Sequence, residues 1–309
     1  MSLRLSINPT CRLRAAATGL AVTAITLLLL CSTSFAQSKR PPARWRPIEQ
    51  ALGTSGKMLP GGVMEIDLPR TDLNVIVHGI PIRPSFDETD LRFMQSKGRT
   101  IVDGEIALVE NEVDSVVSRL LLRGYTVSAI HSHLLAIQPR IIYIHFMGSG
   151  QPAAVASALR YIFAGSSTPL GTSGNQSNTG SGIDTRQIDK IFGEKGEWIG
   201  GVYDISVARR EKIKMSGIAM PSTMGLEHEF SFQPTGGGRA AVTGEIVLIA
   251  KEVNPVIRSL RDKRIQVTAL HNHWLADQPH LFYVHFWAND DAARLARELH
   301  ATLGRTNSK

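Results

Sequence analysis

The sequence predicts an α+β protein in which one unit occurs twice, each copy an antiparallel sheet with helices on one face. Three observations lead to this prediction. The stretch from Gly98 to Phe146 matches the stretch from Gly238 to Phe286 without a gap and with polar identities. Both copies show strand-like and helix-like patterns in the same order. A segment of nearly pure Gly, Ser, Thr and Asn separates them, so the repeat indicates two homologous domains.

The N-terminus has the features of a signal peptide. Arginines at 12 and 14 precede an apolar run, 15–30, and the segment SFA at 34–36 supplies the small residues of a cleavage site. The run is shorter than the ~20 residues that span a bilayer comfortably. We therefore expect residues 1–36 to be removed and the protein to be periplasmic or secreted, with no stable membrane span left. An uncleaved anchor helix and a lipid on Cys31 are the alternatives.

Composition divides the rest of the chain into segments. Residues 37–46 are basic and contain prolines, which predicts a tether, and residues 165–184 predict a flexible linker because they bury little apolar surface. The repeat domains are then 47–164 and 185–304, with a short tail at 305–309.

Charge and cysteine content exclude several classes of function. The predicted mature chain has 31 basic against 27 acidic residues and lacks a dense Lys/Arg run with interleaved aromatics, so nucleic acid is not an expected partner. Both cysteines, Cys11 and Cys31, lie in the leader. The mature part therefore has neither a disulfide framework nor a thiolate site.

The elements of the first copy follow from its apolar pattern. A helix is indicated by apolar residues at the spacing i, i+3, i+4, i+7 and i+8, and Gly124 stands where a helix usually ends. The members of this stripe are Val113, Val116, Val117, Leu120 and Leu121. In the second copy the stripe is Val253, Val256, Ile257 and Leu260.

Strands and a closing helix complete the unit. We expect a turn at Ala136–Pro139 and a final helix marked by Val155, Leu159 and Ile162. The predicted strands are Val63–Leu68, Asn74–Ile82, Leu91–Gln95, Thr100–Val109, Thr126–Leu135 and Arg140–Phe146. The core is thus β-α-β-β-α with extra N-terminal strands, similar to a ferredoxin-like sandwich.

A His-x-His…His signature occurs once in each copy. Its members are His131, His133 and His145 in the first copy and His271, His273 and His285 in the second. Residues i and i+2 of a strand point to one face, about 6.6–7 Å apart. Imidazoles at that spacing are able to converge on one ion through bonds of ~2.0–2.1 Å. The signature therefore predicts a divalent metal such as zinc, or a small polar ligand. Structural hydrogen bonding and acid–base work are the alternatives.

The register of the hairpin decides whether the third histidine joins the pair. With Ala136–Pro139 as a four-residue loop, His145 faces Ile130 and points away from the site. A three- or five-residue loop places it opposite His131, on the same face.

Matched glutamates accompany the histidines. Glu112 and Glu252 lie just inside the start of a helix, where a carboxylate stabilises the helix dipole. They are also our candidates for a catalytic base or a carboxylate ligand. Glu105 and Glu245, in matched strands, are either solvated or on the histidine face.

The segments EVNPV (252–256), ALHNH (269–273) and Tyr283-x-His285 resemble the LppY/LpqO family of exported bacterial proteins with a duplicated domain of unknown function. The first copy keeps Glu112-Val113, AIHSH (129–133) and Tyr143-x-His145. The resemblance implies export and two copies of one fold. It implies no particular activity.

Three functions are consistent with these patterns. The first is an exported binding protein for a divalent metal or small polar ligand, whose two repeats pack as a pseudo-dimer. The second is a metal-dependent hydrolase or lyase. The third is a structural or envelope-interaction module in which the histidines hold the hairpin.

Overall fold

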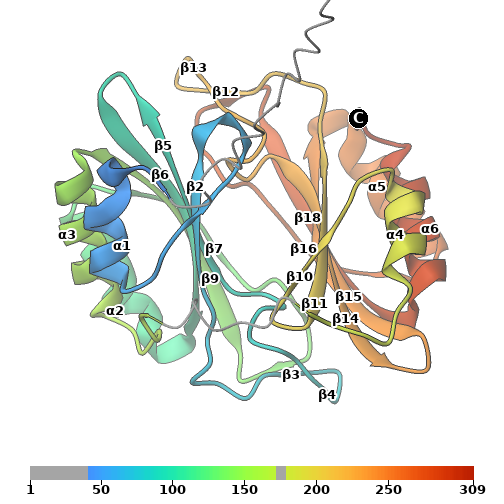
Figure 1. The fold of residues 1–309 in the computed structure, drawn as a ribbon. Coiled ribbons are helices and arrows are strands. Elements are labelled where there is room, and N and C mark those ends of the chain that lie inside the picture. The colour runs from blue at the N-terminus through green and yellow to red at the C-terminus, as the bar shows by residue number, and fades with distance from the viewer. Residues whose placement is uncertain (1–40, 172–178) are drawn as a thin grey trace, which may run out of the picture. The chain divides into compact units, whose positions relative to one another are not determined.

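Two antiparallel sheets face each other, and the helices cover their outer faces (Figure 1). This computed structural model describes residues 41–171 and 179–309. The predicted signal peptide, the first four residues of the predicted tether and residues 172–178 of the predicted linker lie outside the described residues. Both repeats belong to one unit.

The first repeat contributes three main helices and a six-stranded sheet of order β1-β2-β5-β6-β9-β7. Its helical elements are η1 (Ala43–Trp45), α1 (Arg46–Leu52), η2 (Pro60–Gly62), α2 (Glu110–Leu122) and α3 (Pro152–Phe163). Its strands are β1 (Lys57–Met58), β2 (Met64–Leu68), β3 (Ile76–Val77), β4 (Ile80–Pro81), β5 (Thr89–Ser96), β6 (Arg99–Val109), β7 (Thr126–His131), β8 (Ile137–Gln138) and β9 (Ile141–Gly150).

The second repeat has the same layout, with the sheet order β10-β11-β14-β15-β18-β16. Its helices are α4 (Thr185–Phe192), α5 (Ala250–Asp262) and α6 (Ala292–Leu303). Its strands are β10 (Glu197–Ile199), β11 (Val202–Ala208), β12 (Lys214–Met215), β13 (Ile218–Ala219), β14 (Glu227–Gly236), β15 (Arg239–Ile249), β16 (Gln266–His271), β17 (Asp277–Gln278) and β18 (Leu281–Asp291).

The predicted fold class is confirmed. Within each sheet the strand that carries the third histidine, β9 or β18, lies between the two strands that flank the helix α2 or α5. All of these neighbours are antiparallel, which makes the core a split β-α-β unit. Helix α2 ends as predicted, at a left-handed Gly124 with φ of 72°.

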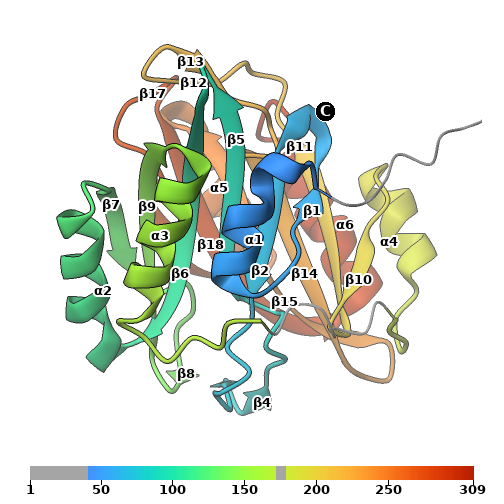
Figure 2. The same cartoon turned by 60° about the vertical axis from the view of Figure 1, so that its left-hand side comes forward.

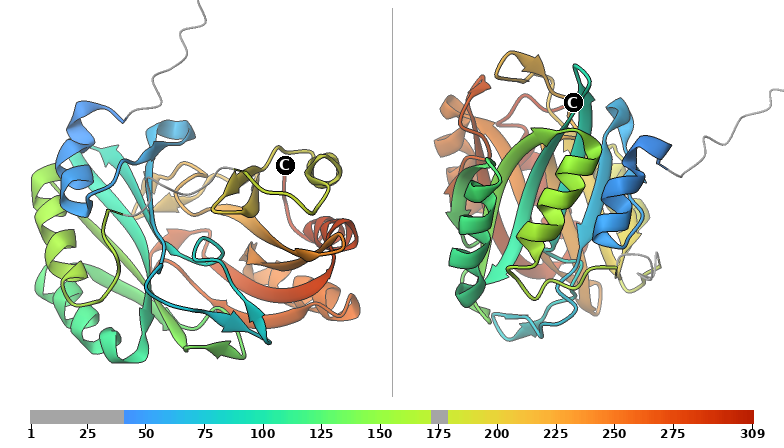
Figure 3. Two further views of the ribbon diagram at one scale, coloured as in Figure 1. Left: turned by 60° about the horizontal axis from the view of Figure 1, so that its bottom comes forward. Right: turned by 90° about the vertical axis from the view of Figure 1, so that its left-hand side faces the viewer.

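The outer core of each repeat packs helices against its own sheet. Figures 2 and 3 show α1, α2 and α3 lying across one face of the first sheet. In the first repeat Val116 and Leu120 of α2 and Leu159 of α3 are buried against Ile106 and Ile144. Because successive strand residues point to opposite faces, the residues next to these apolar ones, Glu105 and His145, point inward.

Two inner clusters join the repeats. One packs Val63 and Met94 of the first repeat against Met224 and Trp274 of the second. The other packs Val77, Phe86 and Leu134 against Val202 and Trp287. Each cluster draws buried apolar side chains from both halves, so the inner faces form a shared core whose burial stabilises their association.

Some predicted boundaries differ. The predicted strand Asn74–Ile82 is a tight hairpin of β3 and β4, because His78 and Gly79 both have positive φ and reverse the chain. Trp45, placed in the tether by prediction, is fully buried in the first core. In the predicted tail, Lys309 donates a backbone hydrogen bond to Ala208.

Within the described residues, no helix has the length and apolar character needed to cross a membrane.

Candidate metal centre

The hairpin register places the histidines of each repeat on the inner face. In the first repeat Ala129 pairs with His145 and His131 pairs with Tyr143, and the second repeat pairs Ala269 with His285 in the same way. Since i and i+2 share a face, His131 and His145 point the same way. A four-residue loop would have turned His145 toward the other face of the sheet. The structure instead has a longer connection, which includes β8, between β7 and β9.

The six histidines form one cluster between the repeats. His131 lies against His271, with 3.7 Å between ring centroids. On one side of this pair His133 stacks between Tyr143 (3.6 Å) and His285 (3.8 Å). On the other side His273 stacks between Tyr283 (3.4 Å) and His145 (4.0 Å). The two signatures of the sequence therefore meet in a single site.

Eight imidazole nitrogens of this cluster lack hydrogen-bond partners among the described residues. Both nitrogens of His131 and of His271 are buried and unpartnered. The same holds for the Nε2 atoms of the four remaining members, His133, His145, His273 and His285. Buried polar atoms are almost always satisfied in native proteins, so a cluster of eight such atoms is a candidate site for a ligand.

Two glutamates stand beside the histidines. Glu105 Oε2 lies 3.1 Å from His145 Nε2 and 3.6 Å from His133 Nε2, without hydrogen-bond alignment. In the second repeat, Glu245 Oε2 lies 3.2 Å from His273 Nε2. The pairing of the strands explains this placement, because Glu105 is directly opposite His145 and Glu245 directly opposite His285.

Several subsets of these side chains, together with Asp87, bring potential ligand atoms close enough to hold a metal ion. One ligand atom from each of His131, His133, His145 and His271 lies within 4.8 Å of all the others. Three smaller groups also meet this limit: Glu105 with His145 and His273, Glu245 with His271 and His273, and Asp87 with Glu105 and His133. Both repeats contribute to the four-histidine group, so this group exists only when the repeats are packed together.

Burial lowers the pKa values of the histidines in this site and so favours their neutral form. It lowers the pKa of His131 to about 4 and that of His271 to about 3, with the neighbouring His131 adding to the shift of His271. It also holds the pKa of His145 and His273 well below the usual range. Neutral imidazole is the form that binds a metal, so these histidines are ready to coordinate at neutral pH.

The two halves of the site are not identical. In the first repeat His133 Nδ1 lies 2.9 Å from Asp87 Oδ1, and the Tyr143 hydroxyl donates to the Asp87 carbonyl. In the second repeat the equivalent hydroxyl, of Tyr283, donates to the carbonyl of Gly225. Asp87 and Gly225 are thus equivalent as carbonyl acceptors for the matched tyrosines, and only Asp87 adds a carboxylate at that point.

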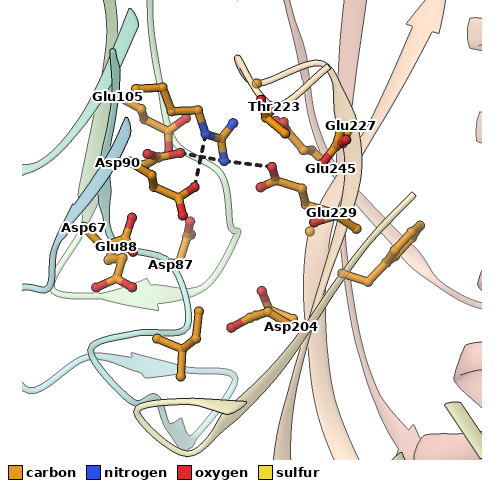
Figure 4. Close-up of a pocket in the computed structure, with 18 of the residues that line it drawn as sticks. Asp67, Asp87, Glu88, Asp90, Glu105, Asp204, Thr223, Glu227, Glu229 and Glu245 are labelled. Atoms are coloured by element: carbon orange, nitrogen blue, oxygen red, sulfur yellow. Dashed lines mark hydrogen bonds and ion pairs between the residues drawn. The ribbon is translucent and has the colours of Figure 1, made fainter. Parts of the chain in front are cut away.

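A cavity of about 460 Å³ opens beside the histidines. Its lining includes His133, His145, His273 and His285. The other walls are acidic, and Figure 4 shows Asp204 on one side facing Asp67, Asp87 and Glu88 across an open space. Burial raises the pKa of Asp204 to about 8 and that of Asp87 to about 7. A positive ion in the cavity would favour the ionised carboxylates.

Arg92 is the least exposed side chain among the cavity's ion-paired basic residues, with 12% of it exposed against 46% for Lys57. Its guanidinium lies 2.7 Å from Asp90 and 2.8 Å from Glu229, and it also contacts Glu65 at 3.4 Å. The Arg92–Glu229 contact joins the two repeats. Trp274 makes a second polar link by donating from Nε1 to Asp103 Oδ1 at 3.0 Å.

The predicted catalytic candidates Glu112 and Glu252 have other partners. Glu112 accepts from Arg70 Nη1 at 2.8 Å and from the backbone N–H of Val109 and Ser167. Glu252 accepts from Arg209 Nη1 at 2.8 Å. Among the described residues, neither glutamate belongs to a group whose potential ligand atoms lie within 4.8 Å of one another. The carboxylates that the structure brings to the histidines are instead Glu105, Glu245 and Asp87.

Sequence reasoning missed Asp87 and Arg92. The polar residues at alternate positions of β2 and β5, Glu65 and Asp67, then Asp90 and Arg92, were the available signal. Such alternation indicates that a strand has one polar face. It does not show that this face lines a closed interior.

Comparisons with known proteins agree with the duplication. No curated protein matches the chain significantly. A trimeric double-ringed shell protein, MSM0271 from the RMM microcompartment, is similar at 10% identity over 68% of this chain and 84% of that one, with a TM-score of 0.18. The trimeric microcompartment shell protein PduB is similar at 11% identity over 78% and 86%, with a TM-score of 0.18. The model of the family described as Domain of Unknown Function (DUF1259) matches residues 46–164 and again 186–305, so the chain belongs to this family and carries its domain twice.

Proposed function

We propose that this chain is an exported protein that binds a divalent transition-metal ion, such as zinc, between its two repeats. The observation that carries the proposal is the set of eight buried imidazole nitrogens without partners, drawn from six histidines of both repeats. Imidazole and carboxylate are the ligands that zinc, copper, nickel and iron commonly use in proteins.

A purely structural role for the histidines fits these contacts less well. A histidine that holds a hairpin together does so by hydrogen bonds, as His228 does by accepting from Val247 N–H at 3.0 Å. His131 and His271 have no such bonds within the described residues. Each buried unsatisfied polar group costs about 1–3 kcal/mol. Metal coordination removes this cost.

Export is part of the proposal because of the N-terminal features. The basic residues, the apolar run 15–30 and the small residues before Gln37 support a leader. The resemblance to the LppY/LpqO family implies the same location. Detection of the N-terminus at Gln37 in protein recovered from the periplasm or medium is the expected result, and a cytoplasmic protein starting at Met1 would contradict export.

Metal analysis of purified protein tests the binding function. We expect bound metal in the isolated chain, and a rise in melting temperature when zinc, copper or nickel is added after chelation. The double variant His271→Ala/His273→Ala should bind less metal and show a smaller rise in melting temperature. His300→Ala is the matched control, because His300 is exposed on α6. A metal-free protein whose melting is unchanged by all three ions would rule the proposal out.

A metal-dependent hydrolase or lyase is the second candidate. It is favoured by the cavity of about 460 Å³, which has a volume typical of small-molecule sites and reaches four of the histidines. A metal-bound water in such a place acts as a nucleophile near neutral pH. The acidic walls favour neutral or cationic substrates over anionic ones. Turnover of neutral ester or amide substrates that disappears on chelation supports this candidate, and metal binding without turnover supports the binding protein.

A further inference from the structure

The number of ligands at the centre exceeds what one ion uses. Six histidines, two glutamates and Asp87 converge there. Zinc takes four ligands and octahedral ions take six. One ion therefore leaves at least three of these nine side chains without a role, and the unpartnered nitrogens span both halves of the cluster.

Two of the ligand groups share no residue, and each comes from one repeat. Asp87, Glu105 and His133 form a group in the first repeat, which we call the first set. Glu245, His271 and His273 form a group in the second, which we call the second set. In each set the ligand atoms lie within 4.8 Å of one another.

We infer that the centre holds two divalent metal ions, one on the first set and one on the second, and this inference rests on the proposed metal-binding function. His133, His273 and Glu245 are each more than nine-tenths buried, so the donors are withdrawn from solvent. His133 has its Nδ1 atom 2.9 Å from Asp87 Oδ1, and its Nε2 atom, like that of His273, is without a hydrogen-bond partner.

The remaining histidines are placed to complete both coordination shells. His145 Nε2 lies 3.1 Å from Glu105 Oε2 of the first set, and His285 Nε2 lies 3.6 Å from Glu245 Oε2 of the second. His131 stacks on His271 and shares a four-histidine group with it. His145 thus supplies a fourth ligand to the first set. His285 and His131 supply the fourth and fifth ligands to the second.

The charge of the surroundings suits two dications. The cavity beside the histidines is lined by twelve acidic residues and by three basic ones, Lys57, Arg92 and Lys195. Arg92 and Lys57 are already in ion pairs with such carboxylates. Asp87 Oδ2, Asp90 Oδ1 and Asp204 Oδ1 are buried without hydrogen-bond partners. Positive charge at the histidines offsets this acidic excess.

The two sets differ in donor chemistry. The first set has two carboxylates and one imidazole, whereas the second has one carboxylate and two imidazoles. Oxygen-rich sites favour harder ions such as manganese, and nitrogen-rich sites favour zinc or copper. The centre is therefore built to discriminate between two ions, and the residue responsible is Asp87, whose equivalent in the second repeat is Gly225.

Cobalt titration of the chelator-treated full chain tests the inference. We expect saturation at two equivalents of Co²⁺ per chain, by calorimetry and by the growth of the visible ligand-field bands. Loading with Mn²⁺ and then Zn²⁺ should leave one of each. Saturation at one equivalent overturns the two-ion inference and leaves the proposed function intact, whereas saturation at zero overturns both.

Two variants assign the equivalents. Asp87→Gly, which copies the second repeat, should weaken one equivalent at least tenfold and leave the other unchanged. Glu245→Gln should weaken the other one. Asp87→Asn, which keeps the side-chain size, guards against a folding defect. Glu110→Gln, an exposed position outside both sets and outside the cavity, should keep both equivalents. If Asp87→Asn and Glu245→Gln weaken the same equivalent, the assignment to two sets is wrong.

Discussion

The imidazole rings of His131 and His271 lie against each other at 3.7 Å between centroids, at the contact between the two repeats. Each ring belongs to one copy of the sequence signature, and neither has a hydrogen-bond partner among the described residues. The contact makes the site a property of the pair of repeats, so the proposed metal binding would be thermodynamically linked to the packing of the repeats.

Removal of this pair should weaken stabilisation by metal. For the unaltered chain, zinc at a hundred times its dissociation constant raises the free energy of unfolding by about 2.7 kcal/mol. His131→Ala/His271→Ala should show a smaller rise in chemical unfolding with and without zinc, while His300→Ala should behave like the parent. An undiminished rise in the double variant would show that zinc binds elsewhere.

Glu112 should be a structural residue. It is buried and bonded to Arg70, Val109 N–H and Ser167 N–H. Burial alone raises its pKa, but these hydrogen bonds and the Arg70 charge bring the pKa below the usual value. Glu112→Ala should cost about 1–3 kcal/mol, because it removes the buried charge-assisted hydrogen bonds to Arg70 and leaves that guanidinium with Asp72 as its one carboxylate partner. The bound-metal content of the folded variant should equal that of the parent, and a loss of metal without loss of stability would contradict this role.

Gly104 and Gly244 stand at matched positions directly before Glu105 and Glu245. Replacing each by alanine should destabilise the fold to a different extent. A Cβ on Gly244 would lie 1.9 Å from the Glu229 carbonyl oxygen, and its φ of 149° is unfavourable for other residues. On Gly104 it would meet the Phe146 ring at 2.3 Å and Leu91 at 2.8 Å, which are side chains. We expect Gly244→Ala to cost roughly 3 kcal/mol or more and Gly104→Ala less, since side chains move more easily than backbone. Urea unfolding of both variants measures the difference, and equal costs would contradict it.

His228 should make the protein sensitive to acid. Burial first, and then the Arg209 charge, lower its pKa to about 3 in the folded protein, against about 6.5 in the unfolded chain. As the pH falls below about 6.5 the unfolded chain takes up the proton first, so stability decreases down to about pH 3. This group alone accounts for roughly 4 kcal/mol between pH 7 and 3.5.

The first repeat offers the control for this prediction. Thr89 takes the place of His228 and accepts from Ala107 N–H at 2.9 Å, as His228 accepts from Val247. His228→Thr should therefore fold and should lose less stability between pH 7 and 3.5 than the parent, measured by urea unfolding at several pH values. An unchanged pH profile would show that His228 is not the group that titrates.

Much of the fold follows from local pattern. The stripe from Val113 to Leu121, the helix end at Gly124 and the repeat of Gly98–Phe146 are determined by neighbours in sequence, and the structure has these elements. The single strand expected at Asn74–Ile82 is wrong, because the positive φ of His78 and Gly79 splits it into a hairpin. A histidine with a positive φ is uncommon, so the residue type at position 78 does not predict the reversal of the chain.

The sequence by itself determined the duplicated α+β unit and the six histidines as a set, because both are written as periodic or repeated local patterns. Only the tertiary structure decided that the two signatures form one centre, that Glu105 and Glu245 stand beside it in place of Glu112 and Glu252, and that Asp87 joins one half. The physical reason is that strand register and the packing of one sheet on another bring together atoms far apart along the chain. These contacts depend on the shared inner core, whose apolar residues come from both repeats.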